Sequence, residues 1–263
     1  MRVVDLDRDM RDVIPTATTR DSDYLFEHMT TRTLDATGAG PGRRVLDVAS
    51  GFGQDARALA GRGGLVVAAE PSGRMAALAR LQDEEHDGPT PTQVRGWADG
   101  LPFADDSFDA VFCKGAIDHF DTPRRAIREM ARVTRPDGRV VLTIANFDSL
   151  ACRIARAGDW FAERWRGTAL PRGRRHYDVP HDHFTRYELD LMREQAGEWL
   201  TLERVEGISL GWGYPRWSRW VTAWPEKLAD LALRGADALA RQWPRGADVV
   251  LLVGRPRSAS TSA

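Results

Sequence analysis

Residues 45–53, VLDVASGFG, combine an acid and two glycines at the point where an apolar run gives way to a helix-forming segment. Asp47 lies within the apolar run, and Gly51 and Gly53 follow it. Because glycine has no side chain, the backbone there can approach a ligand closely at a helix N-terminus. Glu70 ends the next apolar run, LVVAAE, and its carboxylate offers two acceptors to a vicinal diol. The pattern predicts a loop that holds a ribose-containing cofactor, a layout that several cofactors use.

Two kinds of cofactor compete for this loop. Gly51, Gly53 and Ala56 fit the GxGxxA pattern of dinucleotide-binding folds, with Glu70 as the acid on the ribose. Asp47 argues against a dinucleotide, because it occupies a strand-end position where such folds place an apolar residue or their first glycine. It indicates instead a fold that binds an amino acid beside the nucleoside. For the two glycines alone, helix packing without any ligand is the alternative.

A second cluster, HYDVPHDHF at residues 176–184, contains three histidines and two acids. Its H-x4-H-x-H spacing is not a strong zinc signature, and no cysteine lies near it, so we expect no metal. Thr185 and Glu188 instead predict a capping box, with Phe184 and Leu189 as the hydrophobic staple of the next helix. The cluster is therefore expected to shape a lid. Candidates for contact with a substrate are His181, His183 and Tyr187.

Alternating strands and helices must position these residues. Apolar runs predict strands at about 43–48, 65–70, 92–97, 108–113, 139–144, 200–206 and 248–253. Helices are expected at about 22–34, 54–61, 71–81, 122–133 and 186–198, with a turn at 135–138. Ser22 and Ser72 are the predicted caps, and Met75, Leu78 and Leu81 form a predicted buried face. The alternation predicts an α/β fold with a doubly wound, mostly parallel, seven-stranded Rossmann-like sheet.

Two late inserts interrupt this alternation. DSLACRIARAGDWFAERWRG places Leu150, Ile154, Phe161 and Trp165 on one helical face, and 209–245 is rich in tryptophan. Because open α/β sheets bind ligands at the carboxyl edge of their strands, we expect the inserts to form a helical lid there. The expected organisation is an N-terminal helical segment over the cofactor site (1–40), a cofactor-binding core (41–146), a lid insertion (147–185), the rest of the sheet with the insertion 209–245 (186–254), and a disordered tail (255–263).

Most of the nine tryptophans lie in the two inserts, and three interpretations fit them. They can pack the core of a lid, which is the commonest fate of such residues. They can line a pocket for a bulky, mostly apolar substrate. Third, WGYPRWSRWVTAW, with its interspersed arginines, can form a membrane-surface patch that reaches a lipid-like quinone. The spacing gives no clean amphipathic face there, so membrane association is not expected.

Composition limits the class of protein. A chain of 263 residues with 42% hydrophobic content can bury a full core, and its net charge of −1 gives no argument for nucleic acid. Two cysteines are too few for a disulfide framework. The charged N-terminus does not resemble a signal peptide, and no apolar run approaches the roughly 18 residues of a membrane span. We therefore expect a cytoplasmic monomer or homodimer that acts on a small molecule.

The sequence resembles the class I S-adenosylmethionine (SAM) methyltransferases, and within them the small-molecule group called methyltransferase type 11. Asp47-x-Ala49-x-Gly51-x-Gly53 matches that family's D-x-G-x-G-x-G pattern, with Ala49 in the first glycine's place. LPFADDSFDAV, at 101–111, resembles the stretch that leads into the family's fourth strand. AIDHFDTPRRAIREMARVTRPDG, at 116–138, resembles the stretch that follows it. The matching pieces fall in family order over about residues 40–146.

The resemblance implies where SAM would be held. Gly51 and Gly53 would let the backbone pass close to the methionine and ribose, Asp47 would act on the amino group, and Glu70 would take both ribose hydroxyls. The family's Gly-Asp-Ala pattern at adenine is replaced by Gly96-Trp97-Ala98, so Trp97 is expected near the base and Asp99 is a candidate for the adenine amine. The expected cofactor contacts are Asp47, Ala49, Gly51, Gly53, Glu70, Pro71, Trp97, Ala98, Asp99 and Lys114.

Asp118 and His119 follow the predicted fourth strand, where the family places residues beside the methyl group. Transfer to a hydroxyl needs a base, and an unperturbed histidine titrates near neutrality, so His119 is the expected base. The alternative is that His119 packs over SAM or bonds a backbone carbonyl. The catalytic candidates are His119, Asp118, His183 and Tyr187.

The sequence therefore predicts a SAM-dependent methyltransferase that acts on an O, N or C atom of a bulky, largely apolar small molecule, natural-product or quinone-like. S-adenosylhomocysteine would be the second product. A SAM-fold protein that uses bound SAM for another reaction, such as a cyclisation, would have the same sequence pattern at the cofactor site and is the main alternative. A nicotinamide-dependent oxidoreductase is disfavoured by Asp47 and by the missing Tyr-x-x-x-Lys pattern. A binding module without catalysis is the remaining alternative.

Overall fold

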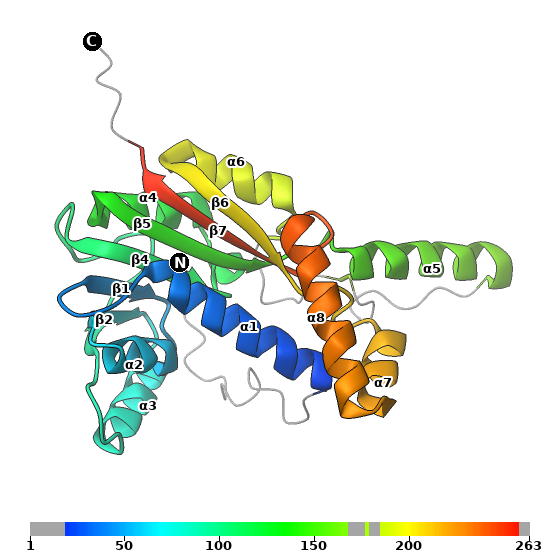
Figure 1. Cartoon of the computed structure of the whole chain (residues 1–263). Helices are drawn as coiled ribbons and strands as arrows, with labels where there is room; N and C mark the ends of the chain where they lie inside the picture. Colours follow the sequence, from blue (N-terminus) through cyan, green and yellow to red (C-terminus); the bar gives the residue numbers. More distant parts are fainter. Residues whose placement is uncertain (1–18, 168–176, 179–184, 258–263) are drawn as a thin grey trace, which may run out of the picture.

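The computed structural model describes residues 19–167, 177–178 and 185–257. Its centre is a seven-stranded sheet in the order β3-β2-β1-β4-β5-β7-β6 (Figure 1). Strands β1 to β5 pair in parallel, whereas β7 is antiparallel to both β5 and β6. The predicted doubly wound, mostly parallel sheet is confirmed. The strands are β1 (Arg44–Val48), β2 (Leu65–Glu70), β3 (Thr92–Arg95), β4 (Phe108–Lys114), β5 (Thr134–Ala145), β6 (Leu200–Ile208) and β7 (Val249–Pro256).

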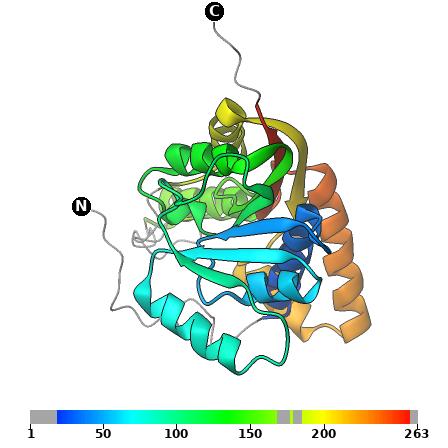
Figure 2. The same cartoon turned by 90° about the vertical axis from the view of Figure 1, so that its left-hand side faces the viewer.

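Helices cover both faces of the sheet (Figure 2). One face carries α1, α2 and α8, with α7 packed on α1, and the other face carries α4 and α6. In the part of the chain that the structure describes, every helix is too short or too polar to cross a membrane. The helices are α1 (Arg20–Thr37), α2 (Gln54–Gly61), α3 (Gly73–Glu84), the 3-10 helix η2 (Ile117–His119), α4 (Pro123–Val133), α5 (Leu150–Arg166), α6 (Leu189–Trp199), α7 (Pro215–Ala223) and α8 (Glu226–Gln242).

The core lies on both sides of the central strands. In β1, Leu46 and Val48 belong to the cluster under α4 and α6, while Val45 belongs to the cluster under α1 and α2. Successive side chains of a strand point to opposite faces, so a strand buried on both sides reads as a continuous apolar run. This packing fixes the end of β1, and with it the loop that follows.

Three of the predicted helix details are wrong, and two, the Ser72 cap and the burial of Met75, are confirmed. Helix α1 begins at Arg20, so Ser22 lies in its first turn, where its hydroxyl lies 2.9 Å from the Thr19 hydroxyl. Ser72 does cap α3, since its Oγ accepts from the backbone N–H of Met75 at 3.2 Å. Leu78 and Leu81, however, are exposed. The buried residues of α3 are Met75, Ala76 and Ala79.

The third error is the capping box at Thr185. Helix α6 begins only at Leu189, with Glu188 at the N-cap position. Thr185 lies before the helix, and its backbone N–H donates to the backbone oxygen of Asp118 at 3.2 Å. This hydrogen bond to a distant segment takes the place of the local one that a capping box would make between the Thr185 N–H and the Glu188 side chain. The predicted turn at 135–138 lies inside β5, where the pairing with β4 is irregular between Phe108 and Ala110.

Helix α5 leaves the sheet at the end of β5. Ser149 caps it by accepting from the backbone N–H of Cys152 at 3.3 Å, and the N–H of Leu150 donates to the backbone oxygen of Gly246 at 2.9 Å. Beyond this first turn the helix extends away from the body of the molecule (Figure 1). The predicted apolar face is present, but Ile154, Phe161 and Trp165 on it are exposed.

Candidate active site

The glycine loop between β1 and α2 is held against the end of β2. The backbone N–H groups of Ala49 and Ser50 both donate to the backbone oxygen of Ala69, at 2.9 and 3.2 Å. Ala49, Gly51 and Gly53 all have positive φ, at 59°, 56° and 77°. A non-glycine residue in this region costs roughly 1–2 kcal/mol, so Ala49 keeps the geometry of the glycine it replaces at a cost in strain. The loop thus turns its backbone toward the carboxyl edge of the sheet.

Glu70 braces this loop. Its Oε2 accepts from the backbone N–H of Gly51 at 2.9 Å, and its Oε1 accepts from the backbone N–H of Ser72 at 2.8 Å. Burial raises the pKa of Glu70, and the two backbone hydrogen bonds oppose that rise. Each carboxylate oxygen keeps a second lone pair. The carboxylate is therefore oriented by the protein and can still accept hydrogen bonds from a diol.

Two carboxylates beside the loop, Asp55 and Asp47, share one lysine. The Lys114 ammonium lies 2.7 Å from Asp55 Oδ2 and donates to the Thr30 hydroxyl at 2.7 Å. Asp47 is buried beside them, and its Oδ2 has no hydrogen-bond partner among the described residues. Burial, reinforced by the negative charges of Asp55 and Glu70, raises the pKa of Asp47, while Lys114 opposes the rise. The site has more acid than base, so it favours a cationic ligand.

Asp55 and Thr30 are the members of this group that the sequence prediction missed. Asp55 could have been recognised as an acid in the first turn of the helix after the glycine loop. Thr30, in α1, carries no such signal. Lys114 was predicted to contact the cofactor. Its ammonium bonds two protein groups, and its contact with the cofactor stays a prediction.

The expected adenine-binding segment forms a tight turn beside α4. The backbone N–H of Gly100 donates to the backbone oxygen of Trp97 at 3.1 Å, and Ala98 packs against the core. Asp99 Oδ2 accepts from the Thr122 hydroxyl at 3.0 Å, which fixes this turn to the start of α4. Pro71 follows β2 directly, and its carbonyl accepts from the Arg95 guanidinium at 2.6 Å. Trp97 is half-buried, as a stacking residue would be.

The structure separates the four catalytic candidates. Asp118 is buried, whereas its neighbour His119, in η2, is exposed at the end of β4. Tyr187 is fully buried in the core, and its hydroxyl donates to Gln195 Oε1 at 2.7 Å. Burial, and then the charge of Asp118, raises the pKa of Tyr187. These contacts give Tyr187 a packing position and do not support a place in the substrate pocket. His183, like His176 and His181, lies outside the described residues.

The residues fit SAM chemically. Glu70 offers a positioned carboxylate to the ribose hydroxyls, and the unsatisfied oxygen of Asp47 suits an ammonium group. The acidic surroundings complement both positive charges of SAM, on its amino group and its sulfonium. Among the described residues no three His, Cys, Asp or Glu side chains come together as metal ligands would.

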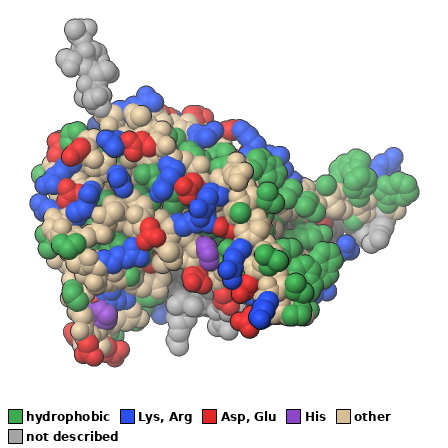
Figure 3. Space-filling model, viewed as in Figure 1, with side chains coloured by type: hydrophobic (Ala, Val, Ile, Leu, Met, Phe, Trp, Pro, Cys, Tyr) green, Lys and Arg blue, Asp and Glu red, His purple; other side chains and the backbone are tan. Residues whose placement is uncertain are grey.

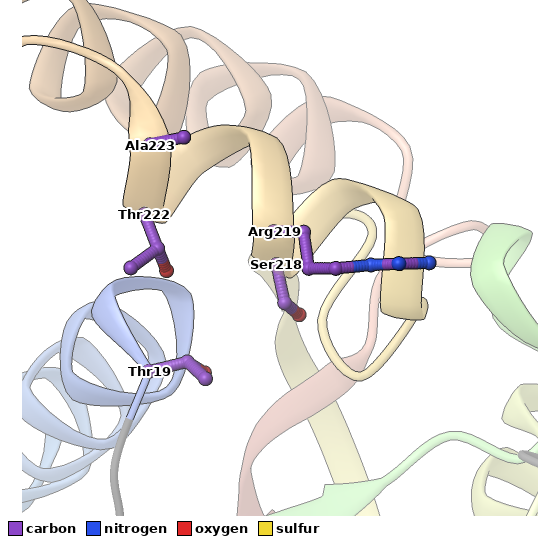
Figure 4. A pocket seen from close by; sticks show the side chains of 5 residues that line it. All are labelled: Thr19, Ser218, Arg219, Thr222 and Ala223. Atoms are coloured by element: carbon purple, nitrogen blue, oxygen red, sulfur yellow. The ribbon is translucent and has the colours of Figure 1, made fainter.

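A separate pocket lies where the N-terminus of α1 meets α7 (Figure 4). Its lining residues are Thr19, Ser218, Arg219, Thr222 and Ala223. None of them belongs to the glycine loop or to the predicted catalytic set. We therefore place the candidate active site at the end of β1, β2 and β4, and not in this pocket.

Comparison with known proteins shows the family of the chain. Residues 46–142 match the family described as "Methyltransferase domain". A demethylmenaquinone methyltransferase of Mycobacterium sp. (strain KMS) is 34% identical over 189 residues, which is 70% of this chain and 74% of that protein. One of Renibacterium salmoninarum is 41% identical over 109 residues, which is 41% of this chain and only 44% of that protein.

Solved structures support the fold. The crystal structure of the YcgJ protein from Bacillus subtilis superimposes with a TM-score of 0.57 at 21% identity, covering 89% of this chain and all of that one. The family match begins within β1 and ends within β5, so it includes the glycine loop, Glu70 and His119. This chain belongs to the family of SAM-dependent methyltransferases.

Proposed function

We propose that the protein transfers a methyl group from SAM to an O, N or C atom of a bulky, largely apolar, quinone-like molecule in the cytoplasm. The observation that carries the cofactor assignment is the carboxylate of Glu70, which two backbone N–H groups orient at the edge of the glycine loop. The acceptor class is supported by the relatives from Mycobacterium and Renibacterium, which are named as demethylmenaquinone methyltransferases.

Each residue of the site has a role in this proposal. Bound SAM supplies an electrophilic methyl group. Glu70 accepts from the two ribose hydroxyls, and Asp47 accepts from the amino group, with Lys114 and Asp55 balancing the charge beneath. Trp97 and Ala98 form one wall of the adenine site, and Asp99 holds that wall to α4 through Thr122. Together they hold the cofactor with its reactive end toward η2.

His119 is the proposed base. It is exposed at the carboxyl end of β4, so an acceptor can reach it without displacing core side chains. A hydroxyl acceptor would give its proton to the imidazole as the methyl group is transferred, while an amine acceptor would need only to be held in line. Asp118 is buried next to it and is proposed to position η2 rather than to touch the acceptor.

The test is incubation of the purified protein with SAM and a set of hydroxylated and unsubstituted quinones, followed by mass spectrometry of both products. The proposal expects S-adenosylhomocysteine and an acceptor heavier by one CH₂ in equal amounts. SAM that binds without being consumed, together with an acceptor that changes without gaining mass, would instead identify a non-methylating reaction such as a cyclisation. Failure of SAM to bind would refute the cofactor assignment.

A further inference from the structure

Helix α5 exposes large apolar side chains along one face. At about 100° per residue, Ile154, Phe161 and Trp165 fall within about 40° of one another around the helix axis. Their exposed fractions are 46%, 56% and 82%. Trp160 lies about 100° from Phe161 around the axis, packs edge-on against the Phe161 ring, and is 59% exposed. The start of the helix is anchored to the body through Ala151 and Cys152, which are buried, and through Arg156, which donates to the Phe147 carbonyl at 3.2 Å. We call the exposed residues Ile154, Trp160, Phe161 and Trp165 the α5 face.

Charge is distributed unevenly around α5. On the helix circumference, Arg164 falls between Trp160 and Phe161, whereas Asp159 and Glu163 fall on the opposite side. Arg153 and Arg156, nearer the body, pair with Asp148. The α5 face therefore has a basic edge and the acids of the helix lie away from it. This is the layout of a helix that lies in the headgroup region of an anionic membrane.

Helix α7 presents a similar surface. Trp220 is 55% exposed, and Trp224, one turn on, is 39% exposed. Arg216, which precedes Trp220 by one turn, and Arg219 are both exposed, and the helix contains no acid. Val221, in contrast, is buried against the cluster that includes Trp217. The helix thus packs Val221 inward, while the large side chains that it exposes are aromatic or basic; the small Thr222 and Ala223 are exposed as well.

Both helices lie at the same end of the molecule (Figure 1). The space-filling view shows hydrophobic side chains gathered over the outer part of α5 and over α7 and α8, with Lys and Arg, and also Asp and Glu, beside them (Figure 3). The chain as a whole carries a net charge of −1, so basic groups around exposed aromatics are a local feature. Monomeric proteins rarely expose such surfaces without a partner.

We infer that the α5 face, with Trp220 and Trp224 of α7, binds the surface of a membrane that contains anionic lipids. Tryptophan and phenylalanine side chains insert at the headgroup level, and arginines beside them pair with lipid phosphates. A second copy of the chain is a poorer match, since it would bring the same arginines face to face across the interface. The inference concerns binding only, and it does not depend on methyl transfer.

The test uses the full chain and vesicles of phosphatidylcholine with and without phosphatidylglycerol. The protein should co-sediment with the anionic vesicles, and added salt should weaken this binding because the arginines are screened. The double variant Phe161→Ser/Trp165→Ser should lower the apparent affinity at least tenfold, and Trp220→Ser should also lower it. The matched control is Leu65→Ser/Leu81→Ser, whose side chains are 59% and 56% exposed on other elements. The control should bind like the wild type.

Hydrogen exchange of the unmodified protein provides a second readout that needs no variant. Vesicles should slow exchange in α5 and α7 and leave α3 unchanged. Absence of sedimentation, equal losses in the variant and the control, or protection outside these helices would overturn the inference. So would a dimer in solution that the Phe161→Ser/Trp165→Ser variant dissociates, because a second copy would then cover this face. Vesicle binding without turnover of any quinone would leave the inference standing while the proposed function failed.

Discussion

Replacement of Glu70 by glutamine is predicted to weaken both the cofactor site and the fold. Glutamine has the same size as glutamate, but one acceptor oxygen becomes an NH₂ donor. Both oxygens of Glu70 accept from backbone N–H groups, one from Gly51 and one from Ser72. The new NH₂ group must therefore face one of these donors, and the glycine loop or the start of α3 has to move.

The expected magnitude follows from this geometry. A hydrogen bond to a charged group contributes about 1.5–3 kcal/mol, so loss of one loop contact should lower the free energy of unfolding by about that amount without any ligand. The ribose hydroxyls lose a charged acceptor as well. SAM affinity should fall by a further 1.5–3 kcal/mol, which is roughly ten- to 150-fold in the dissociation constant.

Urea unfolding without SAM and calorimetric titration with SAM measure the two effects separately. Glu84→Gln is the matched control, because Glu84 is an exposed carboxylate in the last turn of α3. If Glu70→Gln unfolds like the wild type while SAM affinity falls, Glu70 does not brace the loop. Unchanged SAM affinity would refute the ribose assignment itself.

Three further predictions follow from buried or exposed polar groups. Burial raises the pKa of Asp248 from 3.8 to about 7. The free energy of unfolding should therefore fall by about 4 kcal/mol as the pH rises from about 4 to about 7. Urea unfolding of Asp248→Asn should show a flatter pH profile. Lys114→Met leaves Asp55 and Asp47 without their cation and should lower the free energy of unfolding by about 3 kcal/mol, part of which Lys114→Met/Asp55→Asn should restore. His119→Ala should bind SAM like the wild type while turnover falls by roughly 10²–10⁴-fold. Full turnover by that variant would rule out His119 as the base.

The parts of the site that lie next to one another in sequence could be predicted. The strand, glycine loop and helix at 44–61 follow from local apolar patterning and from glycine's freedom at positive φ, which Gly51 and Gly53 use. The second backbone partner of Glu70 is Ser72, only two residues on. Such short-range contacts depend little on the rest of the fold.

Contacts between distant segments could not be predicted. Lys114 meets Thr30 and Asp55 only because α1 and α2 pack on the same face of the sheet, next to the end of β4. The predicted capping box at Thr185 is wrong for the same reason, because the backbone N–H of Thr185 donates to Asp118, which lies far earlier in the chain. In α5 the spacing of Ile154, Phe161 and Trp165 predicted a common face, but spacing does not say whether protein, solvent or lipid meets that face.

The position of β7 between β5 and β6 has a consequence for the order in which the chain folds. Strand β6 pairs with β7 and with no other described strand, yet β7 follows it only after α7 and α8. During synthesis β1 to β5, and with them the glycine loop and Glu70, can form before β7 emerges from the ribosome. Until then β5 has an open edge and β6 has no partner, and open edges are sites of mispairing. Insertion of β7 brings together segments that are far apart in the chain, so we expect it to be the slow step of folding. We expect the SAM site to form before this step.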